Sequence, residues 1–410
     1  MTTKLKNQLQ LNKTLKKYKN KNKSNKYKHT QKKNKRQVSN KILKGGNGYS
    51  DKERIFSVCF SPDGKWIVSG GQDKHVKYWD ASNGKLLKTL YLHTDNVNTV
   101  EFSIDGSFII SASDDKTIKV LELNSNMFIY NFEGLHDSVS TASLSLNNDF
   151  IASDSGNGKY HIQLWKNARP HLDLWKNSGG HIITYHTLSG HTSYVNSLSF
   201  SRIDNSLLVS GSQDNTIKIW NVTNFECLIT LLGHTSHVYS VIFSPDDQLI
   251  LSGSADRTIK IWNATNGECL QTLSGHTSSV NSVSLSNNKE FIVSGSRDKT
   301  LKLWSFGSGE CLRTFEGHSE IVFSVKFNPQ NNKQIAYCFN NQIVILEPSI
   351  SHSRIPSLLT LARSSASKFT KTKTKTYNNL PPHLRRDLNV ESQKHKFPKC
   401  NPNFICYRKD

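Results

Sequence analysis

The sequence contains no long apolar run. No stretch of its 410 residues approaches the roughly 18 consecutive apolar residues of a membrane-spanning helix, and the N-terminus lacks the apolar core of a secretory signal. Seven cysteines in a chain of this length are also too few for a disulfide framework. We therefore expect no membrane span and a reducing compartment, which is the cytoplasm, the nucleus or both.

The sequence also lacks the short motifs of common enzyme classes. It contains no GxxxxGK[ST] phosphate loop, no GxSxG nucleophile turn and no HExxH zinc helix. The histidines between positions 171 and 191 lack metal-ligand spacing, and His395, Cys400 and Cys406 are a weak metal candidate for which a disordered tail is the simpler interpretation. We predict that the protein is not an enzyme and that it holds no metal ion and no cofactor.

Acidic residues are unevenly distributed along the chain. The first 50 residues carry 16 Lys and Arg and no acid, and the last 60 carry 13 Lys and Arg against three acids. Residues 51–350 carry 24 basic and 29 acidic residues. The formal net charge of +21 therefore belongs to two basic tails on a mildly acidic body, which bears on partners and solubility rather than on fold.

Glycine–histidine pairs recur at a nearly fixed interval between residues 190 and 318. Their histidines are His191, His234, His276 and His318, at steps of 43, 42 and 42 residues. Each of the first three pairs is followed by an alternating apolar segment, then SGSxD, then TIKIW or TLKLW, then ExCLxT. A repeat of about 40 residues with this order indicates a radial array of small β-sheets.

The cleanest unit, Gly275 to Glu316, predicts four short strands: VNSVSLS, EFIVSGS, TLKLW and ECLRTF. Such a sheet cannot bury both of its faces alone, so we predict seven stacked units that close into a β-propeller. The units start near Arg54, Asn96, Ser138, Tyr194, His237, Ser279 and Ile321. Cys227, Cys269 and Cys311 recur in the fourth strands, and we expect them to be buried as small hydrophobic residues.

These residues resemble the WD-repeat family over positions 54–348, most specifically in the fourth to sixth units. The resemblance implies an all-β, seven-bladed propeller in which histidine, serine, aspartate and tryptophan form a buried hydrogen-bonded chain. These structural tetrads are His191, Ser210, Asp214 and Trp220; His234, Ser252, Asp256 and Trp262; and His276, Ser294, Asp298 and Trp304. Serine, histidine and aspartate also form catalytic triads, but three copies at one period favour a structural role.

The other four units depart from the pattern, and the seventh is incomplete. It keeps His318 and has three strands before Pro348, so its fourth strand must come from elsewhere. Residues 38–44 resemble the outer strands of other units, and we predict that they close the last blade; residues 355–361 are the alternative. The predicted organisation is a disordered basic tail at 1–37, a propeller at 38–349 and a second basic tail at 350–410.

The opening on the propeller axis is the expected partner site, because aromatic and arginine side chains gathered at one surface are typical of recognition hot spots. The residues that should face it are Arg54, Phe56, Gln72, Asp114, Tyr194, Gln213, His237, Tyr239, Arg297 and Phe323. A longer connection at 166–178 carries a second copy, at 174–177, of the Leu-Trp-Lys-Asn found at 164–167. It is either a second binding loop or a duplication without a role.

The two tails indicate two kinds of partner. Residues 1–37 are rich in lysine and asparagine, which predicts disorder, and their basic runs suit RNA or a nuclear import factor. Residues 355–388 can form two short amphipathic helices and resemble a SOCS box, which implies docking onto elongin and cullin subunits of a ubiquitin ligase. The candidate contacts are Leu358, Leu361, Ala362, Leu380, Pro381 and Leu384. The alternative is an incidental helix that packs on the propeller.

Together these patterns predict a non-enzymatic protein-interaction scaffold. Its more specific form is the substrate receptor of a cullin-type ubiquitin ligase, with the propeller opening for the substrate and the C-terminal tail for the ligase. The competing hypothesis is an assembly factor for ribonucleoproteins whose basic tails contact RNA.

Overall fold

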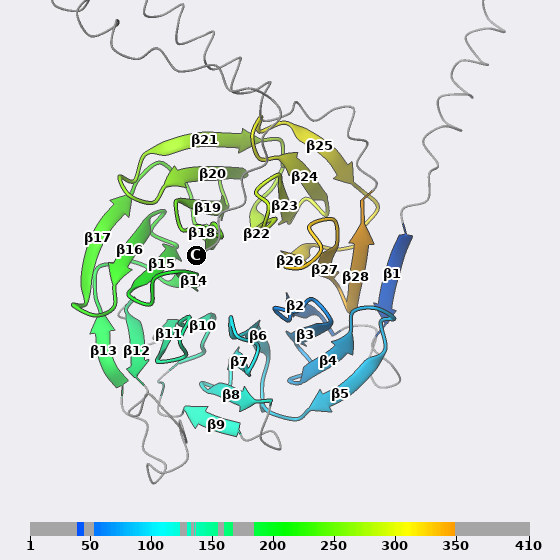
Figure 1. Cartoon of the computed structure of the whole chain (residues 1–410), viewed down its shortest axis with the longest axis horizontal. Coiled ribbons are helices and arrows are strands. Elements are labelled where there is room, and N and C mark those ends of the chain that lie inside the picture. Colours follow the sequence, from blue (N-terminus) through cyan, green and yellow to red (C-terminus); the bar gives the residue numbers. More distant parts are fainter. Residues whose placement is uncertain are drawn as a thin grey trace, which may run out of the picture. The chain divides into compact units, whose positions relative to one another are not determined.

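The computed structural model describes residues 39–44, 53–123, 129–132, 135, 137–154, 160–166 and 184–348. Within these ranges the strands form seven antiparallel sheets of four strands each. Figure 1 shows the sheets placed in chain order around a central axis, as the blades of a β-propeller. The predicted all-β, seven-bladed propeller is confirmed. No helix in the described ranges is long and apolar enough to cross a membrane.

Every blade uses its strands in the same order, from the axis outward (Figure 1). The first three blades are β2 (Ile55–Phe60), β3 (Trp66–Gly71), β4 (Val76–Asp80), β5 (Leu86–Leu90); β6 (Val97–Phe102), β7 (Phe108–Ser113), β8 (Ile118–Glu122), β9 (Ile129–Phe132); and β10 (Ala142–Leu144), β11 (Phe150–Asp154), β12 (Ile162–Lys166), β13 (Thr184–Leu188). The next two are β14 (Val195–Phe200), β15 (Leu207–Ser212), β16 (Ile217–Asn221), β17 (Glu226–Leu231); and β18 (Val238–Phe243), β19 (Leu249–Ser254), β20 (Thr258–Asn263), β21 (Cys269–Ser274). The last two are β22 (Val280–Leu285), β23 (Phe291–Ser296), β24 (Leu301–Ser305), β25 (Cys311–Phe315); and β26 (Val322–Phe327), β27 (Ile335–Phe339), β28 (Gln342–Glu347), β1 (Ser39–Lys44).

The second strand of a blade lies against the neighbouring blade, and this contact explains the SGS sequence. All six residues of β23 are buried. A Cβ atom added to Gly253 would lie 2.8 Å from Val280 Cγ1 of the next blade, and one added to Gly295 would lie 2.5 Å from Val322 Cγ1. Such distances are shorter than any ordinary carbon–carbon contact. Glycine is therefore used here because two blades approach closely.

Serines on the inner strands link successive blades. The N–H of Val241 in β18 donates to Ser197 Oγ in β14 at 3.0 Å. The same contact joins Val100 to Ser57, Val325 to Ser282 and Val283 to Ser240, at 3.1–3.2 Å. At the last seam, the N–H of Val58 in β2 donates to Ser324 Oγ in β26 at 3.3 Å. This bond ties the first blade to the seventh across 266 residues of sequence.

The fourth strand of the seventh blade comes from the start of the described chain. Strand β1 pairs with β28 in antiparallel register, with Ser39 opposite Glu347 and Lys44 opposite Gln342. The seventh sheet therefore combines residues from both ends of the propeller (Figure 1). Neither end can detach from the propeller unless the hydrogen bonds between β1 and β28 break. The alternative segment at 355–361 lies outside the described residues.

The third blade has a shortened inner strand, β10, because a side-chain carboxylate accepts backbone N–H groups that bond to the second strand in other blades. The SGS glycine of other blades is here Asp154, whose carboxylate accepts the N–H groups of Ser140 and Thr141, each at 3.0 Å. Residues before Ala142 therefore bond to this carboxylate, and the regular strand starts later than in other blades. Burial raises the pKa of Asp154 to about 7, although these N–H groups favour its charged form.

The expected burial of Cys227, Cys269 and Cys311 is wrong, since all three are exposed. They lie on the outermost strands, where no further layer covers them. The ladder between the third and fourth strands also shifts register beside each cysteine: Ile219 pairs with Ile229 and Trp220 with Cys227, so that Leu228, the residue after the cysteine, is skipped. The shift places the cysteine next to the buried tryptophan in the ladder, while its side chain stays in solvent.

Candidate functional site

The tetrads form continuous hydrogen-bonded chains, and the sixth blade shows their geometry. A carboxylate only accepts, so His276 donates through Nδ1 to Asp298 Oδ2 at 2.7 Å and accepts the Ser294 hydroxyl at Nε2, also at 2.7 Å. Trp304 Nε1 donates to the same serine oxygen at 2.9 Å. In the fourth and fifth blades the same bonds, at 2.6–2.9 Å, join His191, Ser210, Asp214 and Trp220, and His234, Ser252, Asp256 and Trp262.

Burial prevents these chains from meeting a substrate. Ser294 is 0% exposed, and Trp304 covers its hydroxyl. Burial also lowers the pKa of His276, which keeps the imidazole neutral. Burial alone would raise the pKa of Asp298, but hydrogen bonds from Thr300, the Thr277 N–H and His276 lower it to about 2. The tetrad is therefore a fixed ion–dipole network inside the blade, which braces the loop that carries the histidine.

The other four units keep parts of the network. In the first and third blades, Trp79 and Trp165 donate to Ser69 and Ser153 at 2.9 and 3.2 Å. His93 joins Asp115 and Ser111, each at 2.8 Å, in the second blade, where Leu121 takes the place of the tryptophan. In the seventh blade, His318 bonds instead to the Lys299 carbonyl oxygen at 2.9 Å and the Tyr337 hydroxyl at 3.0 Å. The histidine thus keeps its place and changes its partners where the aspartate is missing.

The face that carries the links from second to third strands, and from one blade to the next, is called here the upper face; the opposite face is the lower face. The ten candidate residues of the opening lie at the starts of inner strands or in the adjoining turns of the upper face. None of the ten is buried. Arg54, Tyr194 and Arg297 are exposed, and the others are half-buried.

Aromatic side chains meet across three seams between blades. Phe56 of β2 packs edge-on against Phe323 of β26, with ring centroids 5.4 Å apart. The Arg297 guanidinium of the sixth blade lies 5.4 Å from the Tyr239 ring centroid of the fifth, and Tyr239 also contacts His237. At the seam between the third and fourth blades, Tyr160 contacts Tyr194 at 5.2 Å. Tyr160 is absent from the sequence-based candidates, because the third unit lacks a recognisable turn.

Asparagine replaces the aromatic residue at the same strand position in three other blades. The amides of Asn98, Asn196 and Asn281 donate to backbone oxygens of the next blade at 2.9–3.0 Å. The polar candidates serve this framework: Asp114 accepts from Asn96 and Asn98, Gln213 donates to Asn196, and Gln72 accepts the Arg54 N–H. The second residue of the inner strand is therefore an asparagine that bonds to the next blade in the second, fourth and sixth blades, and a half-buried aromatic residue in the first, fifth and seventh, a pattern that is readable in the sequence.

The remaining candidates lie outside the described residues. These are the tail 1–37, the connection at 166–178 apart from Lys166, and the candidate ligase contacts at 355–388. Among the residues that the structure describes, no group of three or more His, Cys, Asp or Glu side chains is arranged to hold a metal ion.

A family model for the "WD domain, G-beta repeat" matches six segments that together cover more than half of the chain. They are residues 41–80, 84–121, 183–221, 225–263, 267–305 and 309–345. The chain belongs to the WD-repeat family. The matched segments leave out residues 122–182, which contain three of the four strands of the irregular third blade of this WD-repeat propeller.

Individual relatives match this WD-repeat protein over about one repeat. WD repeat-containing protein pop2 of Schizosaccharomyces pombe is 50% identical over 40 residues, which are 10% of this chain and 6% of the relative. General transcriptional corepressor TUP1 of Saccharomyces cerevisiae is 42% identical over 43 residues, with the same coverage. F-box/WD repeat-containing protein 7 of Drosophila melanogaster is 58% identical over 33 residues, which are 8% of this chain and 2% of the relative. The similarity therefore extends to the repeat, not to whole proteins.

Proposed function

We propose that this WD-repeat propeller is a non-enzymatic scaffold that binds a segment of a protein partner at its upper-face opening. The observation that supports the proposal is the set of aromatic contacts at three seams, Phe56–Phe323, Tyr160–Tyr194 and Tyr239–Arg297. Tyrosine and arginine side chains dominate the energy of many protein interfaces, and here they are held in place by neighbouring blades. A rigid, partly exposed aromatic surface binds with little loss of side-chain entropy.

Substitution of exposed residues tests this site without disturbing the fold. Tyr194 is 46% exposed and Arg297 is exposed, so the double variant Y194A/R297A should fold normally. A matched control is L228A, on outer strand β17, where Leu228 is 47% exposed. We expect proteins captured from a lysate by the wild type and by L228A to be lost from Y194A/R297A. Equal capture by all three chains would contradict the proposal.

The more specific proposal is that the protein delivers a bound substrate to a cullin-type ubiquitin ligase. Its support is the SOCS-like sequence at 355–388, with Leu358, Leu361, Ala362, Leu380, Pro381 and Leu384 as contacts. The F-box/WD relative shows by its name that WD repeats occur in one chain with an F-box, although the matched residues are 2% of that protein. We expect the full chain, but not a 1–350 truncation, to capture elongin and cullin subunits. Their capture by neither chain would exclude this form of the proposal.

The uneven charge supports a second candidate, an assembly factor for ribonucleoproteins. The first 50 residues carry 16 basic residues and no acid, and such a segment binds phosphate backbones in a salt-dependent way. Deletion of residues 1–37 should then remove RNase-sensitive partners and leave those bound at the opening. Partners that resist RNase and survive the deletion favour the protein-binding function alone.

A further inference from the structure

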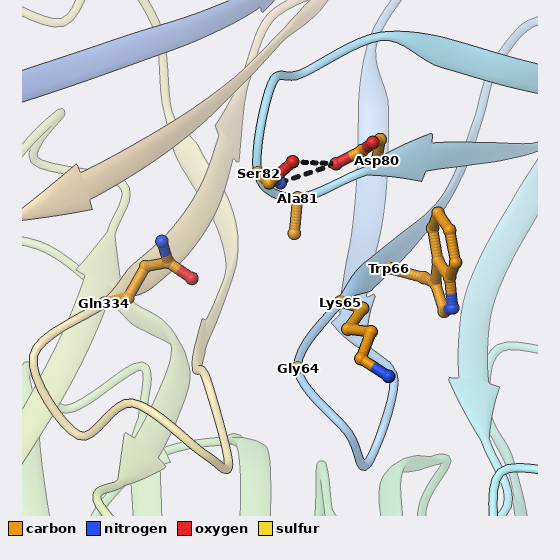
Figure 2. Close-up of a pocket in the computed structure, with 7 residues that line it drawn as sticks. All are labelled: Gly64, Lys65, Trp66, Asp80, Ala81, Ser82 and Gln334. Carbon is orange, nitrogen blue, oxygen red and sulfur yellow. Dashed lines mark hydrogen bonds between the residues drawn. The ribbon is translucent and has the colours of Figure 1, made fainter.

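A pocket of about 320 Å³ lies on the lower face, and both charged residues that line it are already paired (Figure 2). Asp80 Oδ1 accepts the N–H of Ser82 at 2.7 Å, and Asp80 Oδ2 accepts the side-chain amide of Asn83, also at 2.7 Å. The Lys65 ammonium pairs with Asp63 at 3.3 Å. The charges of this pocket are therefore used within the first blade, whereas an arginine of the upper face is not paired in this way.

Arg297 presents its guanidinium at the upper-face opening. The side chain is exposed, and the guanidinium lies 5.4 Å from the ring centroid of Tyr239 in the neighbouring blade. Among the residues that the structure describes, none forms a hydrogen bond or an ion pair with this guanidinium. At the same place in the first, second and fourth blades, Gln72, Asp114 and Gln213 each bond within their own blade. Arg297 is therefore positioned by an aromatic ring and keeps its N–H donors for a ligand.

The chemistry around Arg297 suits a carboxylate. A guanidinium presents N–H donors in a planar fork that matches the two oxygens of a carboxylate, and the contact with Tyr239 holds this fork before a ligand arrives. The nearest lysine in sequence, Lys299, is directed to the loop of the seventh blade, where its ammonium donates to the Ser319 carbonyl oxygen at 2.7 Å. A single guanidinium over Tyr239 balances one negative charge, which fits a carboxylate better than a doubly charged phosphate.

The acidic residues of the upper face lie on other blades. One position in the loop before the inner strand is serine in the fourth, fifth and sixth blades: Ser193, Ser236 and Ser278. In the seventh, first, second and third blades, which follow one another around the axis, the same position is acidic, and we call these residues the acidic arc: Glu320, Glu53, Asp95 and Asp137. None of the four forms an ion pair with a described residue. Arg54, the other exposed arginine of the opening, directly follows Glu53 in this arc. A negatively charged ligand is therefore repelled from these four blades.

We propose that the partner segment carries an acidic side chain, aspartate or glutamate, whose carboxylate binds the Arg297 guanidinium above Tyr239. The acidic arc repels the same side chain, so the segment lies across the opening with its acidic part over the fifth and sixth blades. Arg297 is then the residue that determines which segments bind, while the other aromatic seams supply apolar contact. This inference rests on the proposed function, because it names the chemistry of a segment bound at the same opening.

Selection of random dodecapeptides displayed on phage tests this inference in the full chain. Peptides selected on the wild type should contain about twice as many Asp and Glu residues as those selected on the charge-reversed variant R297E, which should favour Lys and Arg instead. The basic tails of the protein also attract acidic peptides, but they are the same in both chains, so the difference between the two selections reports on Arg297 alone.

The affinity of one selected acidic peptide gives a second readout with a matched control. R297Q should bind this peptide about tenfold more weakly, because a charge-assisted hydrogen bond is lost. R313Q should bind it as the wild type does: Arg313 also lies over an aromatic ring, Phe315 at 4.7 Å, but on the outer strand β25. Replacing the glutamate of the peptide by phosphoserine should change its affinity by less than about threefold. A tenfold gain would overturn the choice of a carboxylate as the ligand.

Two results separate this inference from the proposed function. Peptides that bind Y194A poorly but bind R297Q as tightly as the wild type, with the same acid content in both selections, would overturn the inference and leave the proposed function standing. Peptides that bind Y194A, R297Q and the wild type equally would contradict both, since neither seam would then contribute to recognition.

Discussion

The ammonium of Lys77 in the first blade lies 3.0 Å from the carboxylate of Asp73, and the two side chains are only 7% and 10% exposed. In four other blades the equivalent aspartate bonds to a histidine, which the first unit lacks in sequence. The equivalent lysines there turn outward: Lys218 Nζ, for example, donates to Thr230 Oγ1 at 2.8 Å. Lys77 has therefore turned inward to supply the partner that Asp73 would otherwise lack.

Replacing Lys77 should destabilise the protein far more than replacing an equivalent lysine. Lys77→Ala leaves the Asp73 carboxylate buried without a cation, at a cost of about 3–5 kcal/mol. Lys218→Ala removes only a bond at the surface and should cost less than about 1 kcal/mol. Urea unfolding of the two variants measures both values. Equal losses would show that Lys77 does not replace the histidine.

The glycine of the SGS sequence should be replaceable only where the next blade leaves room. Gly253→Ala places a methyl group within 2.8 Å of Val280, so we expect a loss of about 1–3 kcal/mol. The added change Val280→Ala should recover part of it. The second blade provides the control, because it already carries Ala112 at this position. An unchanged stability of the Gly253→Ala variant would show that the blades are not closely packed there.

The regular blades were predictable from the sequence, because each strand and turn repeats at one period. Residues 190–316 give the strand order and the hydrogen-bonded tetrads directly. The exposure of Cys227 was not predictable, because a register shift at the next residue, Leu228, interrupts the regular alternation of the outer strand. The role of Lys77 could not be predicted from the sequence for another reason. Its position in the repeat is that of a surface lysine in other blades, and its side chain points inward only because the first unit lacks the histidine.

The irregular third blade shows a similar limit. Asp154 replaces a glycine, and nothing in the sequence indicates that its carboxylate takes over backbone hydrogen bonds of the inner strand. Tyr160 belongs to a unit whose sequence lacks the usual turn aspartate, so its contact with Tyr194 was missed as well. The repeat pattern predicts the role of residues that match it. The role of residues that depart from it, such as Asp154 and Tyr160, becomes visible only from their contacts in the structure.

Asp154 should make stability depend on pH in a way that asparagine removes. Its folded pKa of about 7 lies above the unfolded value of 3.8, so the folded state binds an extra proton between these values. Its contribution to stability is therefore full below about pH 4 and is lost as pH rises through 7. From pH 5 to 7.5, the stability of Asp154→Asn relative to the wild type should rise by roughly 2 kcal/mol. A constant difference across this range would contradict the raised pKa.

Deletion of the N-terminal strand should open the propeller. Removing residues 1–44 eliminates six residues of β1 paired with β28, so we expect a loss of at least about 3 kcal/mol, at 0.5 kcal/mol or more per pair. Removing residues 1–37 keeps β1 and should cost less than about 1 kcal/mol. Thermal unfolding of both truncations compares them directly. Equal stability of the two would mean that β1 does not close the seventh blade.

The most direct test of the proposed scaffold function is the dissociation constant of a captured partner, measured by calorimetry against the purified wild type, Y194A/R297A and L228A. We expect Y194A/R297A to bind at least about tenfold more weakly, a loss of about 1.4 kcal/mol, while its unfolding free energy and the affinity of L228A remain those of the wild type. An unchanged dissociation constant for Y194A/R297A would show that the partner binds elsewhere and that the aromatic seams of the upper face are not the recognition site.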